Sequence, residues 1–133
     1  MALLFAAPWS ARADVITIPA SRDTTLYEQS GAKSNGAGEY LFAGINNRGE
    51  RRRALVAFDV AMRLPPGTVV TAAELRLFQS RGQQGAVTVS LHRVRAGWSE
   101  GTSDAAGNEG QGSPASILDA TWSNRVWNTV PWE

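Results

Sequence analysis

The sequence predicts an all-β fold, an antiparallel jelly-roll-like β-sandwich, and three observations carry that prediction. Residues 54–58 are apolar on both strand faces, which is typical of a strand buried between two layers. Residues 87–92 alternate strictly between apolar and polar side chains, as a half-buried strand does. Turn residues at 65–67 and 82–85 separate these runs. Short strands spaced by such turns indicate an antiparallel sandwich.

The N-terminal half contains short strand signals separated by turns. Residues 14–18 alternate as a first strand, and residues 24–27 are a second candidate. A loop rich in Gly, Ser and Asn covers residues 30–38 and is followed by a strand at 40–43. Residues 46–49, Asn-Asn-Arg-Gly, predict a turn before the next strand.

The C-terminal half is predicted to hold strands that begin at Arg53, Val69 and Ala86 and a short one at 120–122. A Gly-rich loop covers residues 101–114, and the tail at 124–133 is expected to be poorly ordered. No window shows the sustained periodicity of a helix. The residues expected to be buried in the sandwich are Val56, Phe58, Leu75, Leu77, Val87, Val89 and Leu91.

Composition narrows the class of protein. A length of 133 residues supports one domain, and a hydrophobic content of 43% is enough for a core. The net charge of +1 gives no general attraction to nucleic acid or to anionic membranes. The chain has no cysteine, which excludes disulfides, thiolate nucleophiles and cysteine-ligated zinc.

The first 13 residues resemble a secretory signal peptide. Residues 3–7 are apolar, and Ala11-Arg12-Ala13 is a small-x-small cleavage site. The stretch is too short to span a bilayer and lacks a positively charged start, so we expect a truncated signal at 1–13 and a secreted domain at 14–133. The alternative is a frayed apolar start of a cytosolic chain. No later run is long and apolar enough to predict a membrane span.

Catalytic motifs are missing from the sequence, and we expect no enzyme. His92 is the one histidine, and Thr88 and Ser90 share its strand face through simple alternation. No G-x-S-x-G, P-loop or H-E-x-x-H pattern occurs. Glu100 and Asp119 are the least implausible pair of carboxylates for glycoside hydrolysis, and both lie beside loop glycines or caps.

Acidic residues in the loops are candidate ligands for a structural calcium ion, because loops supply oxygen ligands to calcium most easily. The alternative is a solvated acidic loop, and no EF-hand pattern fixes a ligand set. The candidate ligands are Asp23, Glu28, Asp104, Asn108 and Glu109.

Four segments together resemble the DNRLRE-type domain, which is also classed as carbohydrate-binding module family ninety-six. They are RALVAFDV, LPPGTVVTAAELRLF, VSLHRVRAGWSEGTS and DATW, and the upstream SRDTTLYEQSGAKSNGAGEYLFAG fits the same pattern. The resemblance covers the chain from Asp14 onward. Domains of this family continue past DATW with further strands, so it implies that this chain is the N-terminal part of such a domain.

The resemblance implies a non-catalytic carbohydrate-binding module of a secreted bacterial protein, attached in relatives to a catalytic or surface domain. Its partner is a polysaccharide, with acidic polysaccharides among the candidates. Sugars stack on aromatic rings and offer hydroxyl or carboxylate groups to polar side chains. Trp98 and Trp122 recur in the family pattern, which also favours a packing role for both. The candidate binding residues are Arg51, Arg52, Arg76, Phe78, His92, Trp98 and Trp122.

The sequence leaves two alternatives to sugar binding open. One is a structural or adhesive extracellular β-sandwich domain without a sugar site, and the other is a non-functional gene fragment. For the run at 51–53, the alternative to a binding role is a solvated loop beside the strand.

Overall fold

The computed structural model describes residues 14–82 and 85–133, and the predicted signal segment lies outside them. The described part is all-β and contains no helix. Its sheets are small and antiparallel. The strands are β1 (Arg22–Tyr27), β2 (Lys33–Ser34), β3 (Gly44–Ile45), β4 (Arg51–Ala57), β5 (Ser113–Pro114), β6 (Asn124–Val126) and β7 (Val130–Pro131).

The central sheet has the strand order β1-β4-β3, and it confirms the strands predicted near residues 24 and 53. β1 is rich in β-branched and aromatic residues, which suit a pleated surface. Its register with β4 sets Leu26 opposite Arg53 and Tyr27 opposite Arg52. The predicted turn at 46–49 is also confirmed, because Asn46 Oδ1 accepts the backbone N–H groups of residues 48 and 50.

One face of the central sheet carries the apolar core. Leu26 and Leu55 pack there with Trp98 and Ala120, which come from the C-terminal loops. The six buried hydrophobic residues of the described part are outnumbered by nine buried polar ones. Hydrogen bonds therefore hold much of this interior together. Thr24 shares a bond of 3.1 Å with Ser34, for example, and the Ser34 hydroxyl donates to the Ala120 carbonyl at 2.8 Å.

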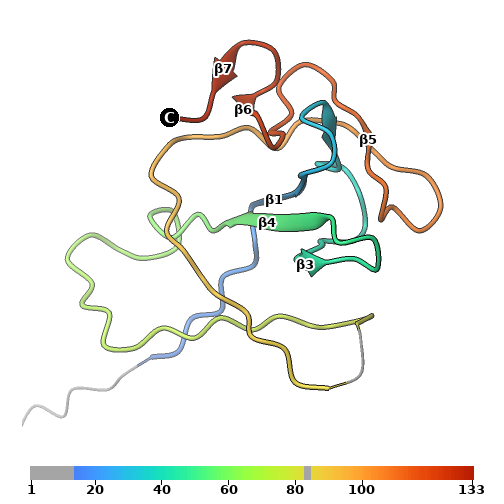
Figure 1. Ribbon diagram of the computed structural model, residues 1–133. Helices are drawn as coiled ribbons and strands as arrows, with labels where there is room; N and C mark the ends of the chain where they lie inside the picture. The colour runs from blue at the N-terminus through green and yellow to red at the C-terminus, as the bar shows by residue number, and fades with distance from the viewer. Residues whose placement is uncertain (1–13, 83–84) are drawn as a thin grey trace, which may run out of the picture.

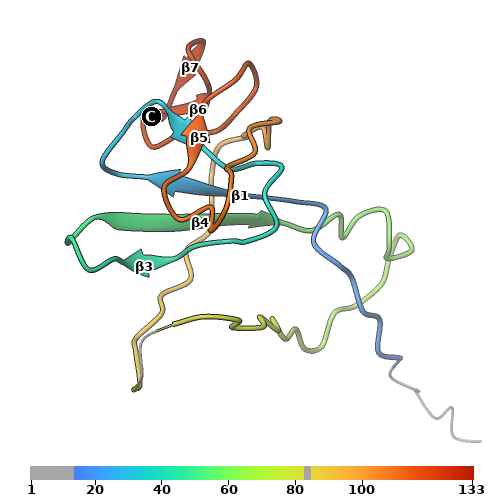
Figure 2. The same cartoon turned by 90° about the vertical axis from the view of Figure 1, so that its right-hand side faces the viewer.

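The loops above the sheet are fastened by short strand pairs. β2 pairs with β5, and β6 pairs with β7 as a C-terminal hairpin. Figures 1 and 2 show β5, β6 and β7 on one side of the central sheet and the extended chain of residues 68–80 on the other. The expectation of a poorly ordered tail at 124–133 is wrong: the Trp132 indole anchors this hairpin by donating to the Thr121 carbonyl at 2.8 Å.

The strands predicted from Val69 and Ala86 do not form, and the burial expected of their side chains is wrong. Leu77 is 63% exposed and Leu91 is 70% exposed, and Leu75, Val87 and Val89 are exposed as well. Val56 and Phe58 are half-buried. The alternating pattern suits an extended chain, but a strand also needs a hydrogen-bonded neighbour, and these two segments have none among the described residues.

Three shorter strand predictions are also wrong. Residues 14–18, 40–43 and 120–122 are irregular, and the strands nearest the last two are β3 and β6. The described strands make three separate small sheets, so the all-β class is confirmed while the jelly-roll arrangement stays a prediction.

Candidate carbohydrate-binding surface

The three consecutive arginines of β4 have different environments because side chains alternate along a strand. Arg51 and Arg53 are exposed and lie on the strand face that also carries Leu55. Arg52 points to the other face and is buried. The run thus supplies two surface cations and one internal one.

Arg52 is committed to internal contacts. Its guanidinium donates to Gln29 Oε1 at 2.6 Å and to Glu50 Oε2 at 3.2 Å. It also reaches the Gly110 carbonyl at 3.2 Å and lies 4.9 Å from the centre of the Tyr27 ring. With these partners Arg52 ties the Gly-rich loop to the sheet.

Of the two surface arginines, Arg53 contacts Trp122 and Arg51 contacts Glu28. The Arg53 guanidinium lies 4.4 Å from the centre of the half-buried Trp122 ring. Arg51 Nη1 donates to Glu28 Oε1 at 2.9 Å, and its backbone N–H donates to Glu28 Oε2 at 3.0 Å. The pKa of Glu28 is lowered, first by that backbone hydrogen bond and further by the charges of both arginines. We call Arg51, Arg53 and Trp122 the arginine–tryptophan surface.

Trp98 is part of the core and is not a surface platform. Its side chain is buried against Leu26 and Leu55. Arg22 lies over its ring at 5.0 Å and donates to its backbone carbonyl at 2.8 Å. Trp98 therefore closes the end of the core, in agreement with the packing role that the sequence also favoured.

Arg76, Phe78 and His92 lie on the extended segments that do not form strands. All three are exposed, and the Arg76 guanidinium contacts Glu74 at 2.8 Å. These three side chains would line up on one face only if their segments were paired as strands, and the segments are unpaired among the described residues. The structure does not bring these three residues together with the arginine–tryptophan surface.

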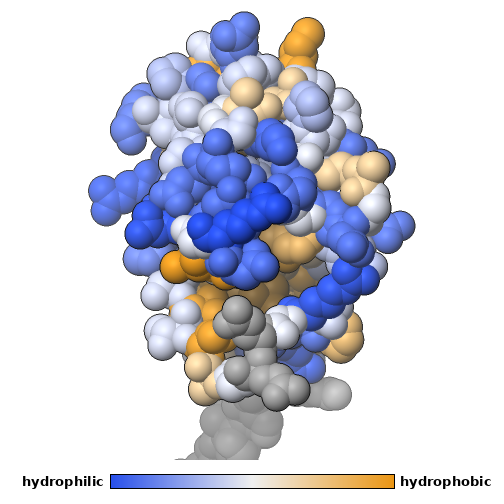
Figure 3. All heavy atoms as spheres, turned by 45° about the vertical axis from the view of Figure 1, so that its right-hand side comes forward, coloured by the Kyte–Doolittle hydropathy of each residue, from blue (hydrophilic) through white to orange (hydrophobic). Residues whose placement is uncertain are grey.

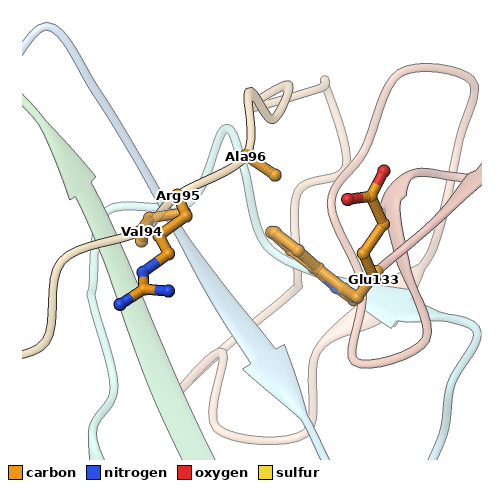
Figure 4. A pocket seen from close by; sticks show the side chains of 5 residues that line it. Val94, Arg95, Ala96 and Glu133 are labelled. Carbon is orange, nitrogen blue, oxygen red and sulfur yellow. The ribbon is translucent and has the colours of Figure 1, made fainter.

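A small cavity lies near the C-terminal hairpin. It has a volume of about 250 Å³ and is lined by Val94, Arg95, Ala96, Trp132 and Glu133. Figure 4 shows Val94, Arg95 and Ala96 along one extended stretch of chain, with Glu133 across from them. The cavity is smaller than the roughly 300–1,000 Å³ typical of pockets for drug-sized ligands. No motif in the sequence predicted this cavity.

The predicted calcium ligands are dispersed. Glu28 is paired with Arg51, Asp104 is exposed, and Asn108 Oδ1 accepts from Arg81 at 3.0 Å. Asp23 lies beside Glu100, and burial together with that charge raises the pKa of Asp23. In residues 14–82 and 85–133 no three His, Cys, Asp or Glu side chains lie close enough to share a metal ion. The five candidate residues therefore do not form one ligand set, and a structural calcium ion stays a prediction.

Glu109 is a buried structural carboxylate. Its oxygens accept from Asn35 Nδ2 at 2.8 Å, from the Tyr40 backbone at 2.9 Å and from the Glu39 backbone at 3.0 Å. Burial raises its pKa, but the three hydrogen bonds outweigh burial and the pKa is lowered overall. The Glu109 carbonyl accepts the Tyr27 hydroxyl at 3.0 Å, and burial raises the pKa of that phenol to about 12.

Asp119 and Glu100, the pair considered for hydrolysis, both bind backbone groups. Asp119 is buried and accepts the N–H groups of Thr102, Ser103 and Ser116 at 2.8, 3.2 and 2.6 Å. Glu100 Oε1 accepts the Asp23 N–H at 2.7 Å. The sequence shows Glu100 beside Gly101 and Asp119 in a short polar and apolar stretch, but only the fold shows that loop backbone groups use both carboxylates.

A scan against models of known protein families, a search of curated proteins and a search of solved structures each gave no match to this chain. The family resemblance noted in the sequence therefore remains a prediction. Within the part of the chain that the structure describes, no helix has the length and apolar character needed to cross a membrane.

Proposed function

We propose that this chain is a non-catalytic carbohydrate-binding domain of a secreted bacterial protein, and that it binds an acidic polysaccharide through the arginine–tryptophan surface. The family resemblance of the sequence supports the class. The placement of Arg53 over the Trp122 ring, beside Arg51, is the observation that carries the proposal.

The chemistry of this surface suits a uronate sugar. A guanidinium binds a carboxylate through two parallel N–H···O bonds, and the sugar's C–H groups pack on an aromatic ring. The contact with Trp122 restricts the Arg53 guanidinium before any ligand arrives. Such preorganisation lowers the entropy cost of binding.

The affinity is expected to be modest and sensitive to salt. An exposed ion pair contributes at most about 1 kcal/mol. Several pairs along a polymer, together with stacking, therefore give a dissociation constant on the order of micromolar or weaker. Added salt weakens binding because exposed charges are screened within about 10 Å at 0.1 M.

The jelly-roll-like sandwich is part of the same proposal. Ala54 and Val56 are only half-buried on the face of β4 opposite the core, and two alternating apolar segments lie extended nearby in the sequence. A second layer of strands built from residues 69–78 and 86–92 would cover that face. Hydrogen exchange at a concentration where the chain is monomeric tests this arrangement: protected alternate amides in both segments support it, and uniformly fast exchange contradicts it.

Charge-neutral variants test the binding surface. Arg53→Gln is expected to weaken binding to polygalacturonate about fivefold, the equivalent of one exposed ion pair. Arg51→Gln is expected to have a smaller effect because Glu28 already holds that guanidinium. Arg63→Gln is the matched control, since Arg63 is also exposed but lies in the turn after β4. Equal weakening by the Arg53 and Arg63 variants would show a general charge effect and no site.

The second candidate, a structural or adhesive domain, is favoured by the exposed apolar side chains of the extended segments. The two functions separate by ligand: a wild-type chain that binds none of the tested polysaccharides but associates with protein supports the structural role.

A further inference from the structure

The segment of residues 71–79, Thr-Ala-Ala-Glu-Leu-Arg-Leu-Phe-Gln, is an extended chain without a partner. None of its backbone groups makes a backbone–backbone hydrogen bond within the described part of the protein. It runs along the side of the molecule away from β5, β6 and β7, at the bottom of Figures 1 and 2. We call it the Leu75 segment. Open backbone groups on an extended chain are a template for pairing with another strand.

The two faces of the Leu75 segment differ. Ala73, Leu75 and Leu77 share one face, and Leu77 is 63% exposed. Glu74 and Arg76 share the other face, where their exposed side chains contact each other at 2.8 Å. Figure 3 shows hydrophobic side chains gathered in the lower half of the molecule, beneath a band of hydrophilic ones. An exposed apolar row beside open backbone groups is typical of an interaction surface.

We propose that two copies of this chain pair antiparallel through their Leu75 segments, with Leu75 directly opposite Leu75 of the second copy. The reason is that this register makes the segment complementary to itself. Glu74 then lies opposite Arg76 of the second copy, and the same ion pair recurs on the other side of the two-fold axis. On the apolar face, Ala73 lies opposite Leu77 of the second copy, so a small side chain meets a large one.

Other arrangements of the same two segments are less favourable. A parallel, in-register pair sets Glu74 against Glu74 and Arg76 against Arg76, and like charges opposite each other destabilise a sheet. Shifting the register by one residue puts Leu75 opposite a charged residue of the second copy. Because the favoured pairing is two-fold symmetric, it closes at two copies. The charge pattern therefore selects a second copy of this chain over an unrelated strand.

Charge reversal tests the register. Glu74→Arg places arginine opposite arginine at both paired positions, and Arg76→Glu places glutamate opposite glutamate. Each variant alone is expected to dimerise about tenfold more weakly in sedimentation equilibrium, since two cross-strand pairs change sign. An equimolar mixture of the two variants is expected to recover the wild-type affinity, because every paired position in the mixed dimer again joins opposite charges. If the variants weakened dimerisation only by breaking the contact between Glu74 and Arg76 within each chain, mixing them would not restore the affinity.

Disulfide trapping tests the centre of the pair, and the chain has no cysteine to interfere. Leu75→Cys is expected to form a covalent dimer under mild oxidation, because directly opposite residues have Cβ atoms about 4.5–5.5 Å apart. Thr71→Cys is the matched control, since its two copies lie eight residues apart along the pair, about 27 Å. A wild-type chain that stays monomeric at all concentrations, equal cross-linking at both positions, or no recovery in the mixture would overturn the proposal.

Discussion

Glu109 offers the sharpest test of how this fold is held together, through the variant Glu109→Gln. The carboxylate accepts three hydrogen bonds, from Asn35 and Tyr40 at Oε2 and from Glu39 at Oε1. Glutamine has nearly the same shape, but only one of its two terminal atoms accepts. Whichever way the amide turns, its NH₂ group faces at least one N–H donor.

The size of the effect follows from those contacts. A hydrogen bond to a charged group contributes about 1.5–3 kcal/mol, and a buried donor without an acceptor costs about 1–3 kcal/mol. The variant loses at least one bond and the charge that strengthens the others. We expect the free energy of unfolding to fall by about 3 kcal/mol at neutral pH, a large part of the roughly 5–15 kcal/mol typical of a domain.

The effect depends on pH in a defined direction. The pKa of Glu109 is lowered in the folded state, so the ionised carboxyl stabilises the fold above the unfolded-state pKa. That contribution is lost as the pH falls through the lowered folded-state pKa. The difference between wild type and Glu109→Gln is therefore expected to shrink in acid.

Urea unfolding of both chains, followed by tryptophan fluorescence at neutral and acidic pH, measures this difference. Glu39→Gln is the control, because the Glu39 side chain is exposed and its removal of charge is expected to change stability by less than about 0.5 kcal/mol. Equal stability of wild type and Glu109→Gln at neutral pH, or a difference that persists unchanged in acid, would refute the reasoning.

Three further predictions concern the core and its edge. Gly112→Ala is expected to lower the free energy of unfolding in urea by about 2 kcal/mol, because the new Cβ would lie 2.8 Å from the Tyr27 ring. Gly107→Ala is the control: Gly107 has a similar positive φ but lies in open space, and the expected loss is about 1 kcal/mol. Trp98→Ala is expected to lower the free energy of unfolding by about 3–5 kcal/mol because Trp98 is buried, and Phe78→Ala is expected to change it very little because Phe78 is 94% exposed. Equal losses in the two variants would contradict this placement of the core. Ultraviolet titration is expected to show a tyrosine, Tyr27, with a pKa of about 12. Because this pKa is raised in the folded state, the stability that it contributes is lost as the pH rises through that value. Ionisation of both tyrosines near pH 10 would contradict it.

Local signals in the sequence predicted local structure. The Asn-Asn-Arg-Gly turn and the strand after it form as expected, because turn residues and two-faced apolar runs act over a few neighbours. The same reasoning failed for residues 69–78 and 86–92. Alternation specifies an extended chain, but it does not say which chain supplies the hydrogen-bonding neighbour.

Long-range contacts were beyond the sequence pattern. Asn35 and Glu109 meet across 74 residues of chain, and no spacing rule connects them. In the arginine run, alternation predicts that one face differs from the other, but not which arginine turns inward. The candidate binding residues therefore include Arg52 and omit Arg53, whereas the structure buries Arg52 and places Arg53 over the Trp122 ring.

Isothermal titration of the chain against polygalacturonate, alginate and a neutral glucan tests the proposed function most directly. The account predicts heat with an acidic polymer, a weaker signal at high salt, no signal with the glucan and no new reducing ends after incubation. No heat with any of the polymers would contradict polysaccharide binding, and the release of reducing ends would contradict a non-catalytic domain.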